Sequence, residues 1–413
     1  MVLKQVMDRK RELNFAVADL LGQVNLAEKD IKRLKLLIRG ALRHFSTLSF
    51  AAMSRLPSYE KDDDEIYLAI LALYELRYSV RTLKKEEVRE QTEEAVRILH
   101  LRLSEKEIDS FLSSPDFRTD LPVEAVEDPW LFCSLNESVP YFLLEKGKEQ
   151  YGEKELASLI RTLNQKRPAY VMLNPMKGNR EELLSSREFV PSPFSKDVYT
   201  YIGRTSLISN RFSKEGKAFG TDLSYALFYQ DLDLSGVQDL LCVYGTDSDW
   251  TMSALAYFRN LKKADVFYAN EMDYRRAKYR AKRLSYSFFR AGLFSLKAED
   301  GMKKGRYDFV IASPDSSSLG SLSDDPTPLA RLKESDFVPL EEEEGKLLSS
   351  LSLAVKDGGY LLYQVKTVNK EEGHGIAEKF LSAHPEFEMK KETGILPDEY
   401  GSFGVYYALF RKK

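Results

Sequence analysis

The stretch "VQDLLCVYGTDSDWTMSALAYFRNLKKADVFYANEMDYRRAKYRAKRLSYSF", residues 237–288, decides the fold of the second half of the chain. It opens with a short apolar run that ends at a glycine, which is typical of a buried strand, and "SDWTMSALAYFRNL" is typical of a helix. "ADVFYANE" then repeats the strand pattern, and "MDYRRAKYRAKRLSYSF" repeats the helix pattern. Strands that alternate with helices predict a mostly parallel, doubly wound sheet.

The same alternation continues to the end of the chain. "GLFSLKAED", "YDFVIASP" and "YLLYQV" are predicted as further strands, and "GVYYALFRKK" as the last one. "EEEEGKLLSSLSLAVKDGG" is expected to form a helix that ends on glycine, and "GIAEKFLSAHP" another helix. Ligands of such sheets bind beyond the carboxyl ends of the strands. The segments to examine are therefore 242–249, 270–273, 298–301, 313–319 and 365–369.

The N-terminal part of the chain predicts helices alone. In "EKDIKRLKLLIRGALRHF" apolar residues recur at helical spacing, and basic residues fall mostly on the other side. "DDDEIYLAILALYELRYSV" opens with acids and is then apolar almost all round, which indicates a central, buried helix. Residues 181–222 give no clear pattern. We expect an all-α domain over residues 1–125, a linker and N-terminal subdomain over 126–222, and a Rossmann-like α/β domain over 223–413.

Composition limits the class of protein. The chain has 413 residues, 43% of them hydrophobic and 30% charged, which fits a soluble protein of two or three domains. A net charge of −3 means that any nucleic-acid contact must come from local basic faces. Cys133 and Cys242 have no paired spacing, and the four histidines follow no metal-ligand pattern. With no signal peptide and no membrane-spanning apolar run, we expect a cytoplasmic protein. We also expect that the protein binds no metal and is a monomer.

Five segments resemble one known family, in that family's order. They are "IRGALRHFSTLSFAAMSRL", "YGEKELASLIRTLNQKRPAYVMLNPMK", "YDFVIASPDSSSLGSLSDDP", "LAVKDGGYLLYQVKTVNKEEG" and "ILPDEYGSFGVYYALFRK". The family is the bacterial Sun (Fmu) family of RNA cytosine-5 methyltransferases, of the small-subunit ribosomal RNA methyltransferase B type. The resemblance implies a NusB-like, RNA-binding helical domain, an S-adenosylmethionine-dependent domain, and RNA, specifically ribosomal RNA, as partner.

The resemblance also places two site residues. The family attacks cytosine with the cysteine of a Thr-Cys pair and uses the cysteine of a Pro-Cys pair to help release product. The matching positions hold Lys366 and Asp315, and neither cysteine of the chain is near them in sequence. A lysine is almost wholly protonated near pH 7, so it is a poor substitute for a thiolate. We expect an Asp315–Lys366 ion pair in preference to a reactive amine.

Cofactor binding is predicted from three places. The family's glycine-rich Ala-Pro-Gly-Gly-Lys turn matches Tyr244, Gly245, Thr246, Asp247 and Ser248, where one glycine remains. Glu271 ends a strand where an acid would accept hydrogen bonds from ribose hydroxyls, and Asp300 fits an acid near the adenine. S-adenosylmethionine is therefore the expected cofactor. A plain strand-to-helix turn capped by Asp247 or Ser248 is the alternative.

RNA contacts are predicted on two basic faces. The run "RRAKYRAKR", residues 275–283, supplies Arg275, Arg276, Lys278 and Arg280, and the helical domain supplies Arg39 and Arg43. An ordinary solvated helix face is the alternative for both. The aromatic residues of 199–219 lie among Arg and Lys and are expected to stack on unpaired bases.

Four functions remain open from the sequence. One is an enzyme that makes 5-methylcytosine, which the two missing thiols oppose. A second is an RNA-binding pseudoenzyme that keeps the scaffold. A third is a methyltransferase with altered chemistry, in which Asp315 acts as a base on an amine or hydroxyl; a protein adaptor built on the helical domain is a further alternative. The sequence favours a diverged family member that binds RNA.

Overall fold

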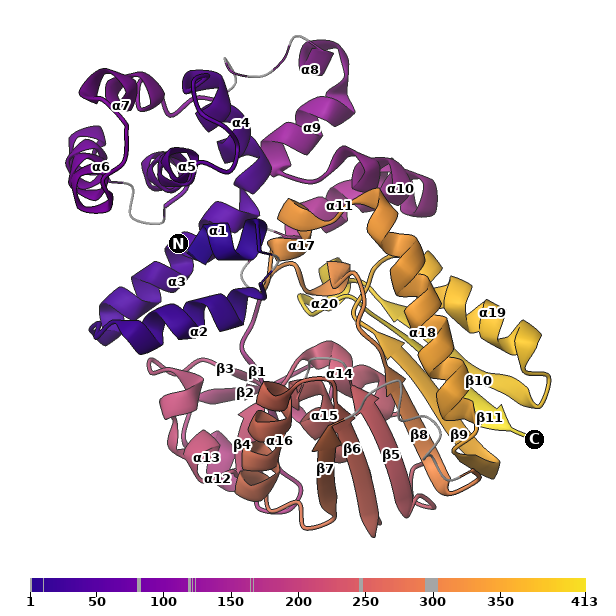
Figure 1. Ribbon diagram of the computed structural model, residues 1–413. Helices are drawn as coiled ribbons and strands as arrows, with labels where there is room; N and C mark the ends of the chain where they lie inside the picture. The colour runs from indigo at the N-terminus through magenta and orange to yellow at the C-terminus, as the bar shows by residue number, and fades with distance from the viewer. Residues whose placement is uncertain are drawn as a thin grey trace. The chain divides into compact units, whose positions relative to one another are not determined.

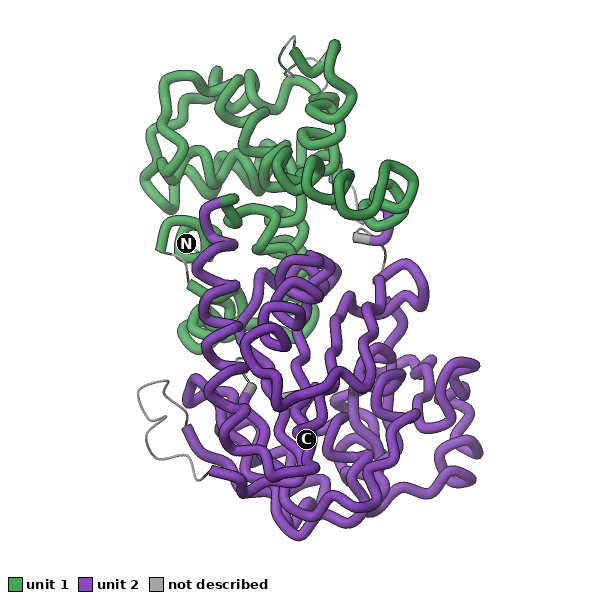
Figure 2. Tube along the Cα trace, turned by 90° about the vertical axis from the view of Figure 1, so that its right-hand side faces the viewer, with its two compact units in different colours: residues 1–160, 324–334 green, residues 161–323, 335–413 purple. Residues whose placement is uncertain are grey.

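The computed structural model describes the chain except residues 1, 10, 80–82, 118–119, 121, 123, 164, 166, 245–247 and 294–303; the side chains of 126, 163, 244 and 248 are also not described. The chain divides into two compact units (Figures 1 and 2). Unit 1 comprises residues 1–160 and 324–334, and unit 2 comprises residues 161–323 and 335–413. The helical domain was expected to end at residue 125, but unit 1 continues to residue 160.

Unit 1 is helical in all its described secondary structure. Its helices are α1 (Val2–Met7), α2 (Leu13–Gln23), α3 (Glu28–Arg43), α4 (Phe45–Arg55), α5 (Asp64–Arg77), α6 (Lys85–Leu99), α7 (Glu105–Phe111), α8 (Glu124–Glu127), α9 (Pro129–Glu137), α10 (Tyr141–Tyr151), α11 (Glu153–Leu163) and α17 (Thr327–Arg331). The last residues of α11 belong to unit 2. As its all-round apolar sequence predicts, α5 is buried along most of its length and contacts α3, α4 and α6. Gly40 of α3 lets the ring of Tyr74 approach closely, because a Cβ there would lie 2.1 Å from that ring.

A segment from the second half of the chain completes unit 1. Helix α17 contacts α1 and α3, and the Arg331 guanidinium donates a hydrogen bond to the Arg11 carbonyl at 3.3 Å. Ala330 packs against the same hydrophobic cluster as α5. The helical core is therefore built from two separate stretches of sequence.

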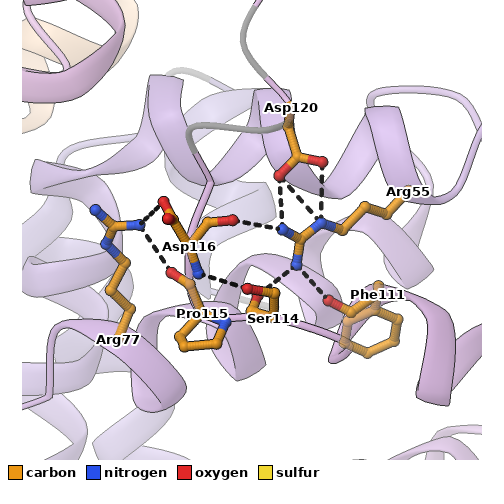
Figure 3. A network of polar contacts seen from close by, with 7 residues as sticks. All are labelled: Arg55, Arg77, Phe111, Ser114, Pro115, Asp116 and Asp120. Atoms are coloured by element: carbon orange, nitrogen blue, oxygen red, sulfur yellow. Dashed lines mark hydrogen bonds and ion pairs between the residues drawn. The ribbon is translucent and has the colours of Figure 1, made fainter.

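A buried arginine fastens the loop that follows α7 (Figure 3). The Arg55 guanidinium donates to the Asp120 carboxylate at 2.6 Å and to the carbonyls of Phe111 and Ser114 at 2.9 and 2.7 Å. A further bond reaches the Asp116 carbonyl at 3.2 Å. Because the side chain of Arg55 is only 8% exposed, its positive charge is largely removed from water, and these partners compensate for the lost hydration.

Unit 2 begins with a small antiparallel sheet, three of whose four strands lie within residues 181–222, for which no elements were predicted. Its strand order is β2 (Phe189–Pro191), β3 (Val198–Tyr201), β1 (Tyr170–Leu173) and β4 (Ala218–Gly220). The accompanying helices are α12 (Arg180–Ser185), α13 (Arg211–Lys214) and the 3₁₀ turn η2 (Leu207–Ser209). Buried Asn174, just after β1, donates to the Gly216 carbonyl at 2.6 Å and to the Leu284 carbonyl at 2.9 Å. This amide ties the small sheet to the end of a helix of the larger one.

The larger sheet has seven strands in the order β10, β11, β9, β8, β5, β6, β7. Their bounds are β5 (Asp239–Tyr244), β6 (Lys263–Tyr268), β7 (Phe289–Leu293), β8 (Tyr307–Ser313), β9 (Val355–Val365), β10 (Phe387–Ile395) and β11 (Val405–Lys412). Strands β5 to β9 run parallel, and β11 runs antiparallel to both β9 and β10. The predicted strands and helices follow one another in the expected order, with β10 as an addition. The third strand, β7, begins before the predicted segment 292–300, and residues 294–300 of that segment lie outside the described residues.

Helices cover both faces of this sheet (Figure 1). They are α14 (Leu223–Tyr229), α15 (Ser248–Leu255), α16 (Glu271–Leu284), α18 (Phe337–Ser352) and α19 (Ile376–Ala383), with the short elements η4 (Leu319–Ser321), η5 (Glu334–Asp336), η6 (Glu371–Gly375) and α20 (Pro397–Tyr400). Leu240 and Cys242 of β5 pack in the core with α14, α15 and α16, whereas Leu241 and Val243 pack with α18 and α19. Alternate side chains of one strand thus enter two cores, which requires the almost continuously apolar strands that the sequence has.

One predicted helix end is wrong. Helix α18 ends at Ser352, and the glycines that were expected to end it lie inside β9. Gly358 has φ +76°, so it forms an irregularity in the strand rather than a helix cap. The prediction of a helical N-terminal region followed by a Rossmann-like α/β module is confirmed.

Candidate functional site

The predicted site residues lie at the carboxyl ends of the parallel strands in unit 2. Lys366 directly follows β9, Asp315 lies in the loop after β8, and Glu271 is the first residue of α16, after β6. The loops after β8 and β9 touch, because the Lys366 carbonyl accepts hydrogen bonds from the Gly320 amide at 3.3 Å and the Ser316 hydroxyl at 3.4 Å. The structure therefore brings together the two loops that the sequence singled out.

The expected Asp315–Lys366 ion pair is not found among the described residues. The Asp315 side chain reaches solvent, yet enough protein surrounds it that desolvation raises its pKa. The negative charges of Glu343 and Asp273 raise that pKa further. An ion pair with a lysine would lower the pKa instead, so the prediction is wrong.

Lys366 lies against aromatic rings. Its ammonium nitrogen is 5.6 Å from the ring centroid of Tyr225, 5.7 Å from that of Trp250 and 5.3 Å from that of Phe403. We call these three rings the aromatic box. Ring faces attract a cation electrostatically, and they do not offer this attraction to a neutral amine. The three contacts therefore hold the Lys366 side chain against the ring faces.

The rings of the aromatic box are buried and held in place. Tyr225 stacks on Trp250 with centroids 4.9 Å apart and an interplanar angle of 11°. The Trp250 indole N–H donates to the Tyr407 hydroxyl at 3.1 Å, and this hydroxyl donates to the Ser224 carbonyl at 3.1 Å. The exposed fractions of Tyr225, Trp250 and Phe403 are 1%, 2% and 8%. Lys366 itself is partly exposed.

A buried acid positions the third ring. The Asp222 carboxylate accepts hydrogen bonds from the Phe403 amide at 2.9 Å and from the Ser224 amide and hydroxyl at 3.0 and 2.6 Å. It also pairs with Arg167, whose guanidinium lies 3.6 Å from the Phe403 ring centroid. Burial raises the pKa of Asp222, although Arg167 and the hydrogen bonds oppose this shift. Sequence reasoning missed Asp222, since a single Asp before a helix predicts only a cap.

A second buried acid joins the two loops. The Glu372 carboxylate accepts hydrogen bonds from the Ser317 amide and hydroxyl, both at 2.6 Å, and from the Thr367 hydroxyl at 2.8 Å. Ser317 belongs to the loop after β8 and Thr367 to the loop after β9. Glu372 therefore fixes the geometry of both loops. The "VNKEEG" segment marked this region in the sequence, but not the role of this residue.

Beside Glu372 lies a carboxyl group with few partners. Glu344 of α18 is 0% exposed, and neither of its carboxyl oxygens has a hydrogen bond of good geometry among the described residues. Desolvation, with the charge of Glu372, raises the pKa of Glu344 to about 10. Burial also raises the pKa of Glu372, but the donors of Ser317 and Thr367 oppose that shift. Of this coupled pair, Glu344 is therefore the group whose surroundings favour the protonated form.

The predicted cofactor residues are covered only in part. Gly245, Thr246, Asp247 and Asp300 lie outside the described residues, and only the backbone of Tyr244 and Ser248 is described. Tyr244 is the last residue of β5 and Ser248 the first of α15, so both stand where the sequence predicted a strand to end and a helix to begin. Glu271 is exposed and its carboxylate lies 2.8 Å from Arg275. An exposed carboxylate at the end of β6 could accept hydrogen bonds from ribose hydroxyls. The same carboxylate would also remain paired with Arg275.

The basic residues of α16 have acidic neighbours. Arg275 pairs with Glu271, Arg276 lies 3.6 Å from Asp273, and Arg280 pairs with Asp249. The Lys278 ammonium is 3.2 Å from the Tyr274 hydroxyl. These pairs reduce the net positive charge of this face. Arg275, Arg276 and Lys278 are nevertheless exposed.

In unit 1 the two predicted RNA-binding arginines differ. Arg39 is exposed, whereas Arg43 is half-buried, and burial lowers its pKa. The aromatic residues of 199–219 are core residues: Tyr199 is 1% exposed, Phe212 1% and Phe219 4%. Their stacking on bases is therefore a wrong prediction, because they fill the interior of the small sheet. Phe194, at 47% exposure, is an aromatic residue of this region that does reach solvent.

Neither cysteine belongs to the loops after β8 and β9. Cys242 is buried within β5, and Cys133 lies in α9 of unit 1. Among the residues that the structure describes, no cluster of His, Cys, Asp or Glu is suited to hold a metal ion. No helix within the described ranges is long and apolar enough to cross a membrane.

The strand order and the helices on both sheet faces define a Rossmann-like fold of the kind found in methyltransferases. In the crystal structure of the protein PH0851, 18% identical, the likeness covers 100% of this chain and 96% of that one, with a TM-score of 0.79. The crystal structure of NSun6 from Pyrococcus horikoshii with SFG, 12% identical, matches with a TM-score of 0.59 over 67% of this chain and 99% of that one. These likenesses concern the fold.

Sequence relatives name the particular family. The chain is 23% identical to the probable ribosomal RNA small subunit methyltransferase B of Bacillus subtilis (strain 168), over 84% of this chain and 83% of the relative. It is also 23% identical to the ribosomal RNA small subunit methyltransferase B of Proteus mirabilis (strain HI4320), over 100% and 97%. No family model matches the chain. The chain is a diverged relative of the methyltransferase B (Sun/Fmu) proteins, as the resemblance predicts.

Proposed function

We propose that this protein binds ribosomal RNA and has lost the thiolate route to cytosine-5 methylation. In this proposal unit 1 supplies a NusB-like RNA-binding domain, and α16 supplies a second basic face. The relatives named above are ribosomal RNA methyltransferases, which supports RNA as the partner. The protein works in the cytoplasm as a monomer.

One observation carries this proposal: the chemistry at the ends of β8 and β9. Carbon 5 of cytosine becomes nucleophilic only after a group adds at carbon 6, and a thiolate does this well near neutral pH. Asp315 and Lys366 follow these strands, neither side chain carries sulfur, and that of Lys366 lies against the aromatic box. Neither residue is a competent attacker in this environment.

The second candidate is a methyltransferase with altered chemistry. The raised pKa of Asp315 favours it, because a carboxylate with a higher pKa is a stronger general base. Asp315 would accept a proton from an amine or hydroxyl of the substrate. S-adenosylmethionine, where it binds, would supply the methyl group, and Glu271 would hold its ribose.

Two titrations separate the candidates. RNA binding is measured by fluorescence anisotropy with a labelled small-subunit ribosomal RNA fragment at several salt concentrations. The proposal predicts binding that weakens linearly with the logarithm of salt concentration, and a smaller slope for Arg275→Gln than for wild type. Lys346→Gln, an exposed charge change on α18, is the matched control and leaves the slope unchanged. Absence of salt-dependent binding contradicts the proposal.

Calorimetric titration with S-adenosylmethionine tests the second candidate. Micromolar binding that Glu271→Ala weakens supports a methyltransferase with altered chemistry. No heat at millimolar ligand supports the RNA-binding scaffold and contradicts the second candidate. Glu342→Ala, an exposed acid far along the sequence on α18, controls for general effects of losing a carboxylate.

A further inference from the structure

We propose that the aromatic box is a binding site for an organic cation, and that in this chain the Lys366 ammonium is its built-in occupant. The ligand class is small, weakly hydrated cations that carry a quaternary ammonium group. This inference does not depend on RNA binding or on methyl transfer.

The geometry of the occupant supports the site. The Lys366 nitrogen lies between 5.3 and 5.7 Å from three ring centroids, whereas other lysines of the described chain that approach rings, such as Lys391 over Phe228 at 5.0 Å, approach one. Rings that converge on one cation are the arrangement that recognises quaternary ammonium groups. A quaternary ammonium is less strongly hydrated than a lysine ammonium, so the same rings attract it at a smaller desolvation penalty.

The positions of the three rings do not depend on Lys366. Trp250 is fixed by its hydrogen bond to Tyr407, Tyr225 by stacking on Trp250, and Phe403 by its amide bond to Asp222. The rings come from α14, α15 and the turn before β11, so three separate elements position them. A site whose walls are held by groups outside it keeps its shape when the occupant is removed.

The location is also that of a ligand site. The aromatic box lies at the carboxyl ends of β5 and β9, the edge at which sheets of this kind bind ligands. The rings are buried and Lys366 is partly exposed, so the lysine side chain is one of the groups that cover the rings. We expect its removal beyond Cβ to open the rings to small molecules.

Tryptophan fluorescence gives the direct test. The chain has two tryptophans, so Trp130→Phe leaves Trp250 as the reporter. Tetramethylammonium chloride is titrated into the full-length Lys366→Ala variant, with neopentyl alcohol as the neutral analogue of the same shape and sodium chloride as the salt control. The proposal predicts saturable quenching by tetramethylammonium, with an apparent affinity at least tenfold higher than for the chain that keeps Lys366.

Matched variants make the result decisive. The Lys366→Arg variant keeps a cation in the aromatic box, so it should not bind tetramethylammonium. The Lys391→Ala variant removes a lysine that lies over a single ring, so it should create no binding site. Equal quenching with and without Lys366, or an equal response to neopentyl alcohol, overturns the proposal. No saturable response in a folded Lys366→Ala variant, as judged by circular dichroism, also overturns it.

A second measurement uses the native side chain, so it does not require the alanine variant to fold. Lysines of the full-length protein are reductively methylated with ¹³C-formaldehyde and observed by NMR. The proposal predicts one dimethyl-lysine signal shifted upfield by the ring currents of the aromatic box and absent from Lys366→Arg. A Lys366 signal at the position of exposed lysines contradicts occupancy of the aromatic box.

Discussion

Replacing Glu344 with glutamine is expected to change how the stability of unit 2 depends on pH. Glu344 is fully buried beside Glu372, and its pKa is raised from 4.5 to about 10. Between these values the folded protein keeps a proton on Glu344 that the unfolded chain releases. The free energy of unfolding therefore falls as pH rises through this window, because the native state binds the additional proton.

The magnitude follows from the size of the window. Each pH unit above the ordinary pKa costs about 1.4 kcal/mol of stability, so the effect of Glu344 is roughly 4 kcal/mol at pH 7.5. Glutamine has the same shape and no titration. The stability difference between variant and wild type should therefore shift in favour of Glu344→Gln by about 3 kcal/mol between pH 6 and pH 8. This change is independent of how well the buried amide is paired, since that contribution does not vary with pH.

Thermal unfolding at several pH values, followed by calorimetry, measures the difference. About 3 kcal/mol corresponds to a change in relative melting temperature of roughly 5–10 °C for a unit of this size. Glu342→Gln, an exposed neighbour on the same helix, is the control and should track wild type. Parallel melting curves for Glu344→Gln and wild type from pH 6 to pH 8 would refute a protonated Glu344.

Three further substitutions test other parts of the fold. Arg55→Met should destabilise unit 1 by about 3–5 kcal/mol in denaturant unfolding, because it leaves the Asp120 carboxylate, 12% exposed, without its partner; an effect below 1 kcal/mol contradicts this. Asn174→Ala should cost about 2–3 kcal/mol in the same assay, because two buried carbonyls lose their donor; unchanged stability would show that water replaces the amide. Gly320→Ala should prevent stable folding of unit 2, since a Cβ there would lie 1.8 Å from the Gly404 carbonyl oxygen; a wild-type melting temperature contradicts that close approach.

Much of the fold could be predicted because its signal is local. The buried parallel strands are continuous apolar runs, and α5 is apolar all round, so each element shows its environment in its own sequence. Strand β10 was not predicted because it lies at the edge of the sheet and reads "FEMKKETGI", with few apolar residues. Edge strands often carry charged side chains. Such side chains interrupt the alternation of apolar and polar residues from which a strand is predicted.

The site was less predictable because its contacts are not local. Lys366 and Asp315 were found from their strand ends, but the aromatic box takes Tyr225, Trp250 and Phe403 from distant segments. No sequence spacing links these rings. Glu344 offered a signal that was not used: it lies three and four residues before Leu347 and Leu348, on the apolar stripe of α18.

The aromatic residues of 199–219 show the opposite error. Their proximity to Arg and Lys suggested an RNA surface, yet consecutive residues of β3 and β4 are buried, in two different hydrophobic clusters. Successive side chains of a strand point to opposite faces, so a strand that is covered on both faces buries its aromatic residues whatever charges stand beside them in the sequence. The exposed Phe194 lies between strands, where the sequence pattern gave no reason to select it.

The most direct test of the account is a methyl-transfer assay with the purified full-length chain. Unmodified small-subunit ribosomal RNA is incubated with S-adenosylmethionine carrying a labelled methyl group, and the digested nucleosides are identified by mass spectrometry. The account predicts RNA binding without labelled 5-methylcytosine above the level of a protein-free control. Turnover to 5-methylcytosine that is abolished by Lys366→Ala would contradict it.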